Sequence, residues 1–172
     1  MKNDSNEKKA AFWYECFAVA QKHELLDEAM YAINKALQYQ PNKSGLWFRK
    51  GHIYYKLKDY RNAEMALSRA IAIKPTNGKA LVCIAFLKQD LGLYSEAKKW
   101  FERGVEVRPD DHDLITILAN YNLKTDPQKA IELTEKALAI APENDEAANI
   151  RDDALKMIAN KKRKTKNSRN RK

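Results

Sequence analysis

The sequence has few of the residues that interrupt helices, and it has no hydrophobic run long enough to cross a membrane. It holds five glycines and five prolines among 172 residues, of which 44% are hydrophobic and 32% are charged. This composition is typical of a soluble helical protein. No apolar run approaches the ~20 residues of a membrane-spanning helix, so we expect no membrane insertion. The nearest match to a secretory signal, residues 10–20, is interrupted by Glu15, and we expect a cytoplasmic protein.

The motifs of common enzyme classes are also missing. The sequence has no glycine-rich phosphate-binding loop, no nucleophile elbow and no pair of histidines at a metal-binding spacing. Its two cysteines, Cys16 and Cys83, form no CxxC motif. Their separation disfavours a disulfide, and two free thiols are ordinary in a reducing compartment. We therefore expect no enzymatic activity, no metal and no cofactor.

Four of the five prolines follow a regular spacing. Pro41, Pro75, Pro109 and Pro142 lie 34, 34 and 33 residues apart. Proline ends a helix because it lacks an N–H and clashes with the preceding turn, so this spacing indicates an array of one repeated unit. Such an array presents an extended surface rather than an enclosed catalytic pocket.

The residues between these prolines repeat as well. Each unit carries apolar residues at three- and four-residue steps in two successive segments, as expected of a helix–turn–helix. Small residues such as Gly51 and Ala63 recur where two helices would approach closely, and large residues such as Trp47 and Leu67 recur beside them. The sequence therefore predicts an all-α fold.

One unit carries the pattern of a known family. It resembles the tetratricopeptide repeat through Trp47-x2-Lys50-Gly51-x2-Tyr54, then Ala63-x3-Leu67, then Pro75. The resemblance covers residues 10–142 and implies a small stand-alone α-solenoid that winds into a right-handed superhelix. We expect repeats at residues 10–43, 44–77, 78–111 and 112–144, the last of them degenerate.

Both ends of the array depart from the pattern. Phe17 stands where glycine or alanine is expected, and a one-residue shift of the first helix would place Ala18 there instead. In the fourth repeat, Asn122 replaces the tyrosine and Thr134 replaces a large apolar residue. We expect residues 1–9 to be flexible and residues 145–160 to form a C-terminal capping helix. The alternative is that this helix enters the groove as a built-in inhibitor.

The resemblance also implies a binding surface on the concave face, which the first helices of the repeats line. In the central repeats the implied positions are aromatic and basic, and these suit an extended peptide with acidic and apolar side chains. The alternative is that the rings pack on neighbouring helices and the cations are merely solvated. The expected groove residues are Tyr14, Phe48, Arg49, His52, Tyr55, Lys56, Lys79, Phe86, Gln89 and Asn120.

Two sharper hypotheses for the groove fit the sequence poorly. Some family members hold a partner's C-terminal carboxylate with a clamp of lysine, asparagine and arginine side chains, but only Lys79 matches that pattern here. His52 and Cys83 fall on adjacent first helices and could form a thiolate–imidazole pair. No acid that would orient the imidazole is evident in the sequence.

Positive charge is concentrated at the C-terminal end. Residues 1–160 hold 24 basic and 23 acidic residues, whereas residues 161–172 hold eight basic and no acidic ones. We expect this polybasic tail to be disordered, because it lacks apolar residues and repels itself. Three interpretations are open: RNA or DNA binding by counterion release, a nuclear localisation signal that an import receptor reads in a eukaryote, or a solubilising tail. The basic residues are Lys161, Lys162, Arg163, Lys164, Lys166, Arg169, Arg171 and Lys172.

The sequence thus predicts a non-enzymatic adaptor or scaffold that docks a peptide segment of an unidentified partner protein in its central groove. The alternative is a nucleic-acid-associated or nuclear adaptor that the basic tail recruits to RNA, DNA or an import receptor. Homo-oligomerisation of the array is a third interpretation. The identity of the partner does not follow from the residues that define the repeat.

Overall fold

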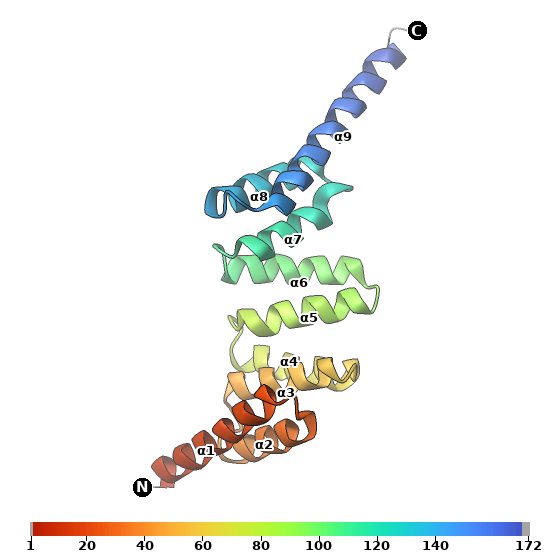
Figure 1. Ribbon diagram of the computed structural model, residues 1–172. Coiled ribbons are helices and arrows are strands. Elements are labelled where there is room, and N and C mark those ends of the chain that lie inside the picture. The colour runs from red at the N-terminus through yellow and green to blue at the C-terminus, as the bar shows by residue number, and fades with distance from the viewer. Residues whose placement is uncertain (1, 170–172) are drawn as a thin grey trace. The chain divides into compact units, whose positions relative to one another are not determined.

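The computed structural model describes residues 2–169, with side chains described for residues 5–163, and this part of the chain is entirely helical and loop (Figure 1). The predicted all-α class is confirmed. In chain order the helices are α1 (Lys2–Lys22), α2 (Leu26–Tyr39), α3 (Ser44–Lys56), α4 (Tyr60–Ile73), α5 (Gly78–Asp90), α6 (Tyr94–Val107), α7 (His112–Leu123), α8 (Pro127–Ile140) and α9 (Asp145–Arg169).

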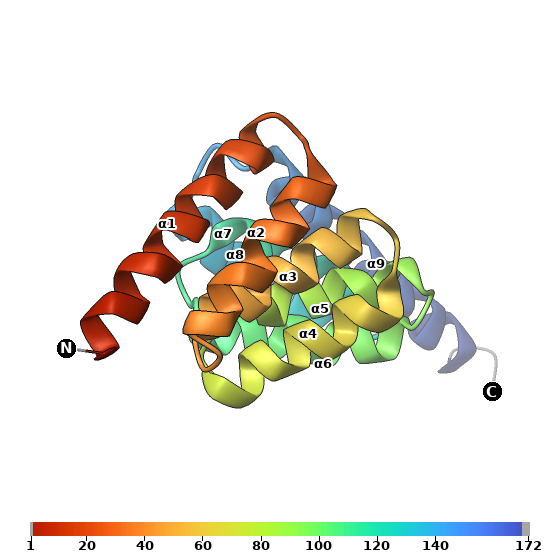
Figure 2. The same ribbon diagram turned by 90° about the horizontal axis from the view of Figure 1, so that it is seen from below.

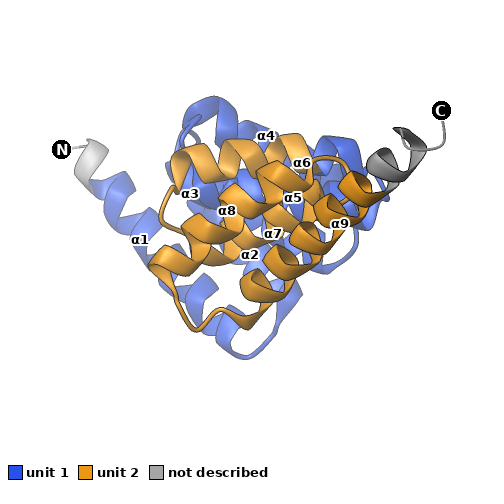
Figure 3. Ribbon diagram, turned by 90° about the horizontal axis from the view of Figure 1, so that it is seen from above, with its two compact units in different colours: residues 1–97 blue, residues 98–172 orange. Residues whose placement is uncertain are grey.

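The chain forms two compact units, residues 1–97 and residues 98–172, and the boundary passes through α6 (Figure 3). In the first unit α1 pairs with α2 and α3 pairs with α4, while α2 contacts α3 and both α3 and α4 contact α5 (Figures 1 and 2). In the second unit α7 pairs with α8, and α9 lies against both of them. Ala147, Ile150 and Ala154 of α9 are buried.

Close packing within a helix pair depends on small residues at the contact. A Cβ atom at Gly51 of α3 would lie 2.6 Å from Cγ of Leu67 on α4, which is shorter than a non-bonded contact allows. In the first pair, Phe17 takes the corresponding position and is 2% exposed, whereas Ala18 is exposed. The alternative register with Ala18 at the contact is therefore wrong.

The first three hairpin turns share one backbone conformation, a residue with a positive φ angle. Glu24, Lys58 and Gly92 lie 34 residues apart and have φ angles of +58°, +59° and +73°. At the second turn, the N–H groups of Lys58 and Asp59 donate to carbonyls in the last turn of α3. This pattern satisfies carbonyls that a helix end would otherwise leave unpaired. The turn conformation therefore repeats even where the sequence has no glycine.

The two polar replacements in the fourth repeat are buried but hydrogen-bonded. The Asn122 side chain accepts from Nζ of Lys98 at 2.7 Å and donates to the Leu118 carbonyl at 2.8 Å. The Thr134 hydroxyl lies 3.0 Å from the Ala130 carbonyl, to which it donates within its own helix. Buried polar groups that keep such partners cost little stability, so the fourth pair keeps the form of the others.

The terminal helices extend further than the sequence predicts. Because α1 begins at Lys2, the flexible segment expected at residues 1–9 is wrong for residues 2–9. Because α9 continues to Arg169, the disordered tail expected from residue 161 is wrong for residues 161–169. Lysine and arginine have high helix propensity, and lengthening an existing helix needs no new nucleus. Residues 170–172 lie outside the described residues.

Candidate peptide-binding groove

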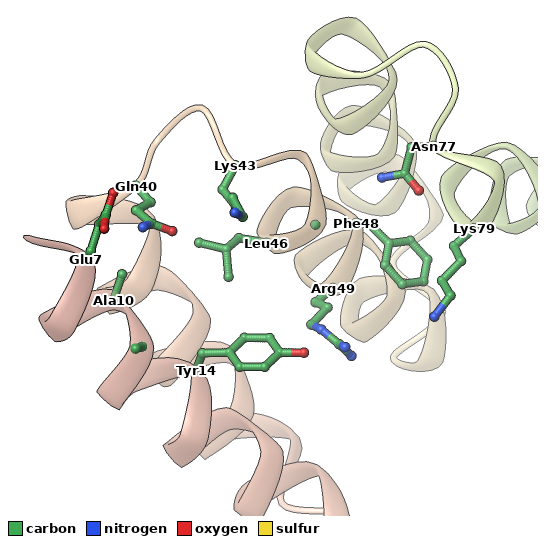
Figure 4. Close-up of a pocket in the computed structure, with 12 residues that line it drawn as sticks. Glu7, Ala10, Tyr14, Gln40, Lys43, Leu46, Phe48, Arg49, Asn77 and Lys79 are labelled. Atoms are coloured by element: carbon green, nitrogen blue, oxygen red, sulfur yellow. The ribbon is translucent and has the colours of Figure 1, made fainter.

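A pocket of about 390 Å³ opens in the first unit between α1, the α2–α3 turn, α3 and the start of α5 (Figure 4). Four of the residues that the sequence analysis assigns to the groove line it, namely Tyr14, Phe48, Arg49 and Lys79. The full lining is Glu7, Ala10, Ala11, Tyr14, Gln40, Lys43, Gly45, Leu46, Phe48, Arg49, Asn77 and Lys79.

Arg49 stacks on two aromatic rings of α1. Its guanidinium carbon lies 5.0 Å from the ring centroid of Tyr14 and 5.1 Å from that of Phe17. Stacking of this kind uses the face of the guanidinium and leaves the N–H donors in its plane available to a ligand. Among the side chains that the structure describes, none forms an ion pair with Arg49. The two rings therefore orient Arg49, and no described carboxylate neutralises its charge.

Phe48 and His52 form a second aromatic pair on α3. Their ring centroids lie 5.9 Å apart with the planes inclined by 28°, and both residues are half-buried. Burial lowers the pKa of His52, and the positive charges of Lys56 and Arg49 lower it further. Since histidine ordinarily titrates near pH ~6.5, His52 is neutral at pH 7. It adds an apolar surface beside Phe48 rather than another charge.

Two lysines bring further positive charge to the pocket. Lys43 lies in the turn before α3 and Lys79 at the start of α5, and both are exposed (Figure 4). Neither forms an ion pair with any side chain in the described part of the chain. With Arg49 they outnumber the one carboxylate of the lining, Glu7. The local charge therefore favours an acidic ligand over a basic one.

The remaining expected groove residues of α3 and α5 lie outside this pocket. The Tyr55 hydroxyl donates to Oδ2 of Asp90 at 2.7 Å, and burial together with this bond raises the pKa of Tyr55. Tyr55 therefore links α3 to α5. Lys56 is exposed at the end of α3, and Phe86 and Gln89 are half-buried on α5.

Asn120 and the basic C-terminal residues belong to the second unit. Asn120 is exposed on α7, and Lys161, Lys162 and Arg163 are exposed on α9. The side chains of the later basic residues lie outside the described ones, as do residues 170–172 altogether. These later residues are Lys164, Lys166, Arg169, Arg171 and Lys172.

Part of the lining lies outside the first helices of the repeats, on which all the expected groove residues fall. Lys43 and Asn77 immediately precede α3 and α5 as their N-cap residues and lie 34 positions apart. Because Lys43 and Asn77 occupy the same position in successive repeats, the sequence could have indicated both. Glu7 and Gln40 carried no such signal, because they come from the extension of α1 and the end of α2.

The structure does not favour the thiolate–imidazole pair considered from sequence. Cys83 is buried, and its burial raises the pKa of the thiol to about 12, so it stays protonated at neutral pH. Within the described residues, no group of three or more histidine, cysteine, aspartate or glutamate side chains is arranged to hold a metal ion. The described helices also include none with the length and apolar character needed to span a bilayer.

Comparison with known proteins identifies this arrangement. Two family models, both described as tetratricopeptide repeat, match residues 45–77 and 79–111. A tetratricopeptide repeat protein from Parabacteroides merdae superposes with a TM-score of 0.77 at 16% identity, covering 89% of this chain and 61% of that one. The chain is built of helix–turn–helix repeats, and residues 45–77 and 79–111 are similar to the tetratricopeptide repeat. Proteins of this family are generally non-enzymatic scaffolds for protein–protein interactions.

Two further proteins are similar to this chain. Anaphase-promoting complex subunit 3 of Schizosaccharomyces pombe is 24% identical over 123 residues, which is 71% of this chain and 18% of that protein. The first tetratricopeptide repeat domain of Spaghetti (RPAP3), bound to the HSP90 peptide SRMEEVD, superposes with a TM-score of 0.63 at 25% identity, covering 67% of this chain and 94% of that one. The chain spans 10 to 18% of the length of the curated relatives it matches.

Proposed function

We propose that this chain is an adaptor or scaffold whose first unit docks an extended peptide segment of a partner protein in the pocket between α1, α3 and α5. The observation that carries the proposal is an arginine that stacks on aromatic rings, lines the pocket and has no carboxylate partner in the described chain. The peptide-bound tetratricopeptide domain of Spaghetti supports a ligand of this class.

The lining residues define the chemistry of the peptide. Arg49 offers paired N–H donors that suit a carboxylate side chain. Phe48, stacked with His52, offers a flat apolar surface beside it, and Tyr14 is 37% exposed on the opposite helix. A segment that places an aspartate or glutamate next to an aliphatic or aromatic residue would contact both surfaces at once.

The proposal can be tested with a random-sequence peptide library displayed on phage and selected against the full chain. Enriched sequences should combine acidic with apolar residues. A synthetic peptide from the selection, titrated by calorimetry, should bind at least about tenfold more weakly to Lys79→Glu and to Phe48→Ala. Lys99→Glu makes the same charge change at an exposed position outside the pocket and should leave the affinity unchanged.

Two outcomes would count against peptide docking in this pocket. One is a selection that enriches no acidic sequences. The other is a peptide whose affinity falls equally for Lys79→Glu and Lys99→Glu, because that result would reflect net charge alone. Circular dichroism spectra of the variants separate a loss of binding from a loss of folding.

A second candidate function rests on the basic continuation of α9. The helix runs to Arg169, with Lys161, Lys162 and Arg163 exposed and no acidic residue from position 161 onward. A helix of this charge would contact nucleic-acid phosphates or an import receptor. If it binds duplex oligonucleotides, their affinity should fall steeply with added salt and vanish on deletion of residues 161–172. The same deletion should leave peptide binding intact.

A further inference from the structure

One end of the peptide pocket carries positive charge without a carboxylate. Figure 4 shows the guanidinium of Arg49 and the Nζ end of Lys79 on either side of the Phe48 ring, both directed into the same part of the pocket. Glu7, the one carboxylate of the lining, lies beside Gln40 at the opposite end. We call the site made by Phe48, Arg49 and Lys79 the cationic end of the pocket.

The pKa of His52 indicates that the surroundings of the cationic end are positive. Burial lowers this pKa most, and the two charges that lower it further, on Lys56 and Arg49, are both positive. A carboxylate close to the ring would raise the pKa of a histidine instead. Because His52 stacks with Phe48, the positive potential extends along the aromatic pair before any ligand binds.

A hydrogen-bonded bridge fixes the two helices that carry the cationic end. Asn77, the N-cap residue of α5, donates through Nδ2 to the Ser44 hydroxyl at 2.7 Å and accepts the Ala80 N–H through Oδ1 at 3.2 Å. The Ser44 hydroxyl donates in turn to the Ala70 carbonyl at the end of α4, at 2.8 Å. Since Ser44 begins α3, the bridge holds the starts of α3 and α5 together. The two cations are therefore carried on a preorganised frame.

We propose that the cationic end binds a phosphorylated side chain of the partner peptide, a phosphoserine or phosphothreonine next to an apolar residue. This inference rests on the proposed peptide docking and specifies the acidic group that the pocket accepts. A phosphomonoester carries close to two negative charges at pH 7 and three acceptor oxygens. It matches Arg49 and Lys79, which form no ion pair in the described chain, whereas a carboxylate would neutralise only one of them.

The side chains of the cationic end are presented in a way that suits a phosphate. The guanidinium of Arg49 stacks on the rings of Tyr14 and Phe17, with its carbon 5.0 and 5.1 Å from their centroids, so its N–H donors can bond two phosphate oxygens side by side. Lys79, exposed at the start of α5, offers its donors to the third oxygen. The Phe48 ring between them would contact the apolar neighbour of the phosphorylated residue.

Peptide libraries with a fixed central residue test the proposal on the full chain. The central residue is phosphoserine, aspartate or serine, and the other positions are varied. The best sequences from each library are synthesised with all three central residues and titrated by calorimetry. The phosphoserine form should bind at least about tenfold more tightly than the aspartate form and about a hundredfold more tightly than the serine form.

Substitutions show where the phosphate binds. Arg49→Gln should reduce the preference for phosphoserine over aspartate to about a tenth of its value, because it removes the paired donors. Arg69→Gln makes the same change at an exposed position of α4 outside the pocket lining, so it should leave the preference unchanged. Circular dichroism of both variants confirms that they are folded.

Inorganic phosphate distinguishes a phosphopeptide site from a site for free phosphate. Because it lacks an apolar residue to contact Phe48, it should displace the phosphopeptide only at concentrations at least about a hundredfold above the Kd of that peptide. Displacement near the Kd itself would identify a site for the free anion and would overturn the proposal.

The remaining outcomes separate this proposal from the peptide docking on which it rests. If aspartate peptides bind as tightly as phosphoserine peptides and Lys79→Glu weakens both, the pocket docks acidic peptides without selecting phosphate, and only the present proposal is wrong. If no library yields a binder, or binding is insensitive to Lys79→Glu and Phe48→Ala, both proposals are wrong. A preference for phosphoserine that persists in Arg49→Gln would place the phosphate outside the cationic end and likewise overturn the assignment.

Discussion

Replacing Gly51 with alanine tests the close contact between α3 and α4. The added Cβ would lie 2.6 Å from Cγ, 2.9 Å from Cδ2 and 3.1 Å from the backbone nitrogen of Leu67, which is fully buried. Relief therefore requires either the side chain or the helix to move. Overpacking of this kind costs about 1–3 kcal/mol, and the better helix propensity of alanine offsets about 1 kcal/mol of it. We expect the free energy of unfolding to fall by up to about 2 kcal/mol.

Urea unfolding followed by circular dichroism measures this loss, and two further variants interpret it. Gly45→Ala, also on α3, places its Cβ where no atom lies within 4 Å, so it should be neutral or stabilising. Leu67→Ala should cost about 2–5 kcal/mol alone, but less in the Gly51→Ala background, because the new methyl group fills part of the cavity. If Gly51→Ala proved as stable as Gly45→Ala, the two helices would not be held at this distance.

Three smaller predictions use the same unfolding assay. Lys58→Gly should raise the free energy of unfolding by up to about 1 kcal/mol, because glycine adopts the observed φ of +59° without strain; a lower urea midpoint would contradict this. Lys88, whose side chain is 11% exposed, pairs with Glu64 at 2.8 Å and Glu96 at 3.1 Å. Both carboxylates are partly solvated, so the ion pairs should contribute less stability than the buried stem of the lysine. Lys88→Met keeps that stem and should therefore lower the free energy of unfolding by less than the roughly 1–3 kcal/mol expected for Lys88→Ala. Equal losses for the two variants would show that the ion pairs dominate. The pKa of His52 is lower in the folded chain than in the unfolded one. As the pH falls through ~6.5, the unfolded chain therefore binds a proton at this residue before the folded chain does, and stability should decline between about pH 7 and pH 5. His52→Asn should flatten that decline, and an unchanged pH profile would assign it to another group.

The helix pairs could be predicted because their contacts depend on residue size at a regular spacing. Gly51 is small and Leu67 is large at places where the repeat requires a close approach beside a filled space. Phe101, 34 residues after Leu67, is likewise fully buried. Residue size and spacing can both be read from a sequence, so these contact positions can be predicted without a structure.

The turns and helix ends could not be predicted in the same way. Glu24 and Lys58 adopt the left-handed conformation although neither is glycine, because closing each hairpin against its partner imposes that backbone angle. The basic segment after residue 160 satisfies the composition of a disordered tail, yet it continues α9. A prediction of disorder from charge repulsion does not take into account that the segment directly follows a helix, which can be lengthened without a new nucleus.

The groove was only partly visible from sequence. The pocket does contain Tyr14, Phe48, Arg49 and Lys79. Phe17 counted as a mismatch to the repeat, although its ring is one of the two that orient Arg49. Such contacts depend on the separation and crossing of α1 and α3, which a residue spacing along the chain does not encode.

The repeat also separates the residues that stabilise the array from those available to a ligand. On α3, Gly51 and Ile53 are buried against neighbouring helices, so their size is constrained. Phe48 and Arg49 precede them in the sequence but are only half-buried, on the side that lines the pocket. Substitutions there should cost the fold little, because packing does not prescribe their chemistry. The repeat pattern therefore accounts for the fold of this chain, and it leaves the chemistry of the pocket residues unconstrained.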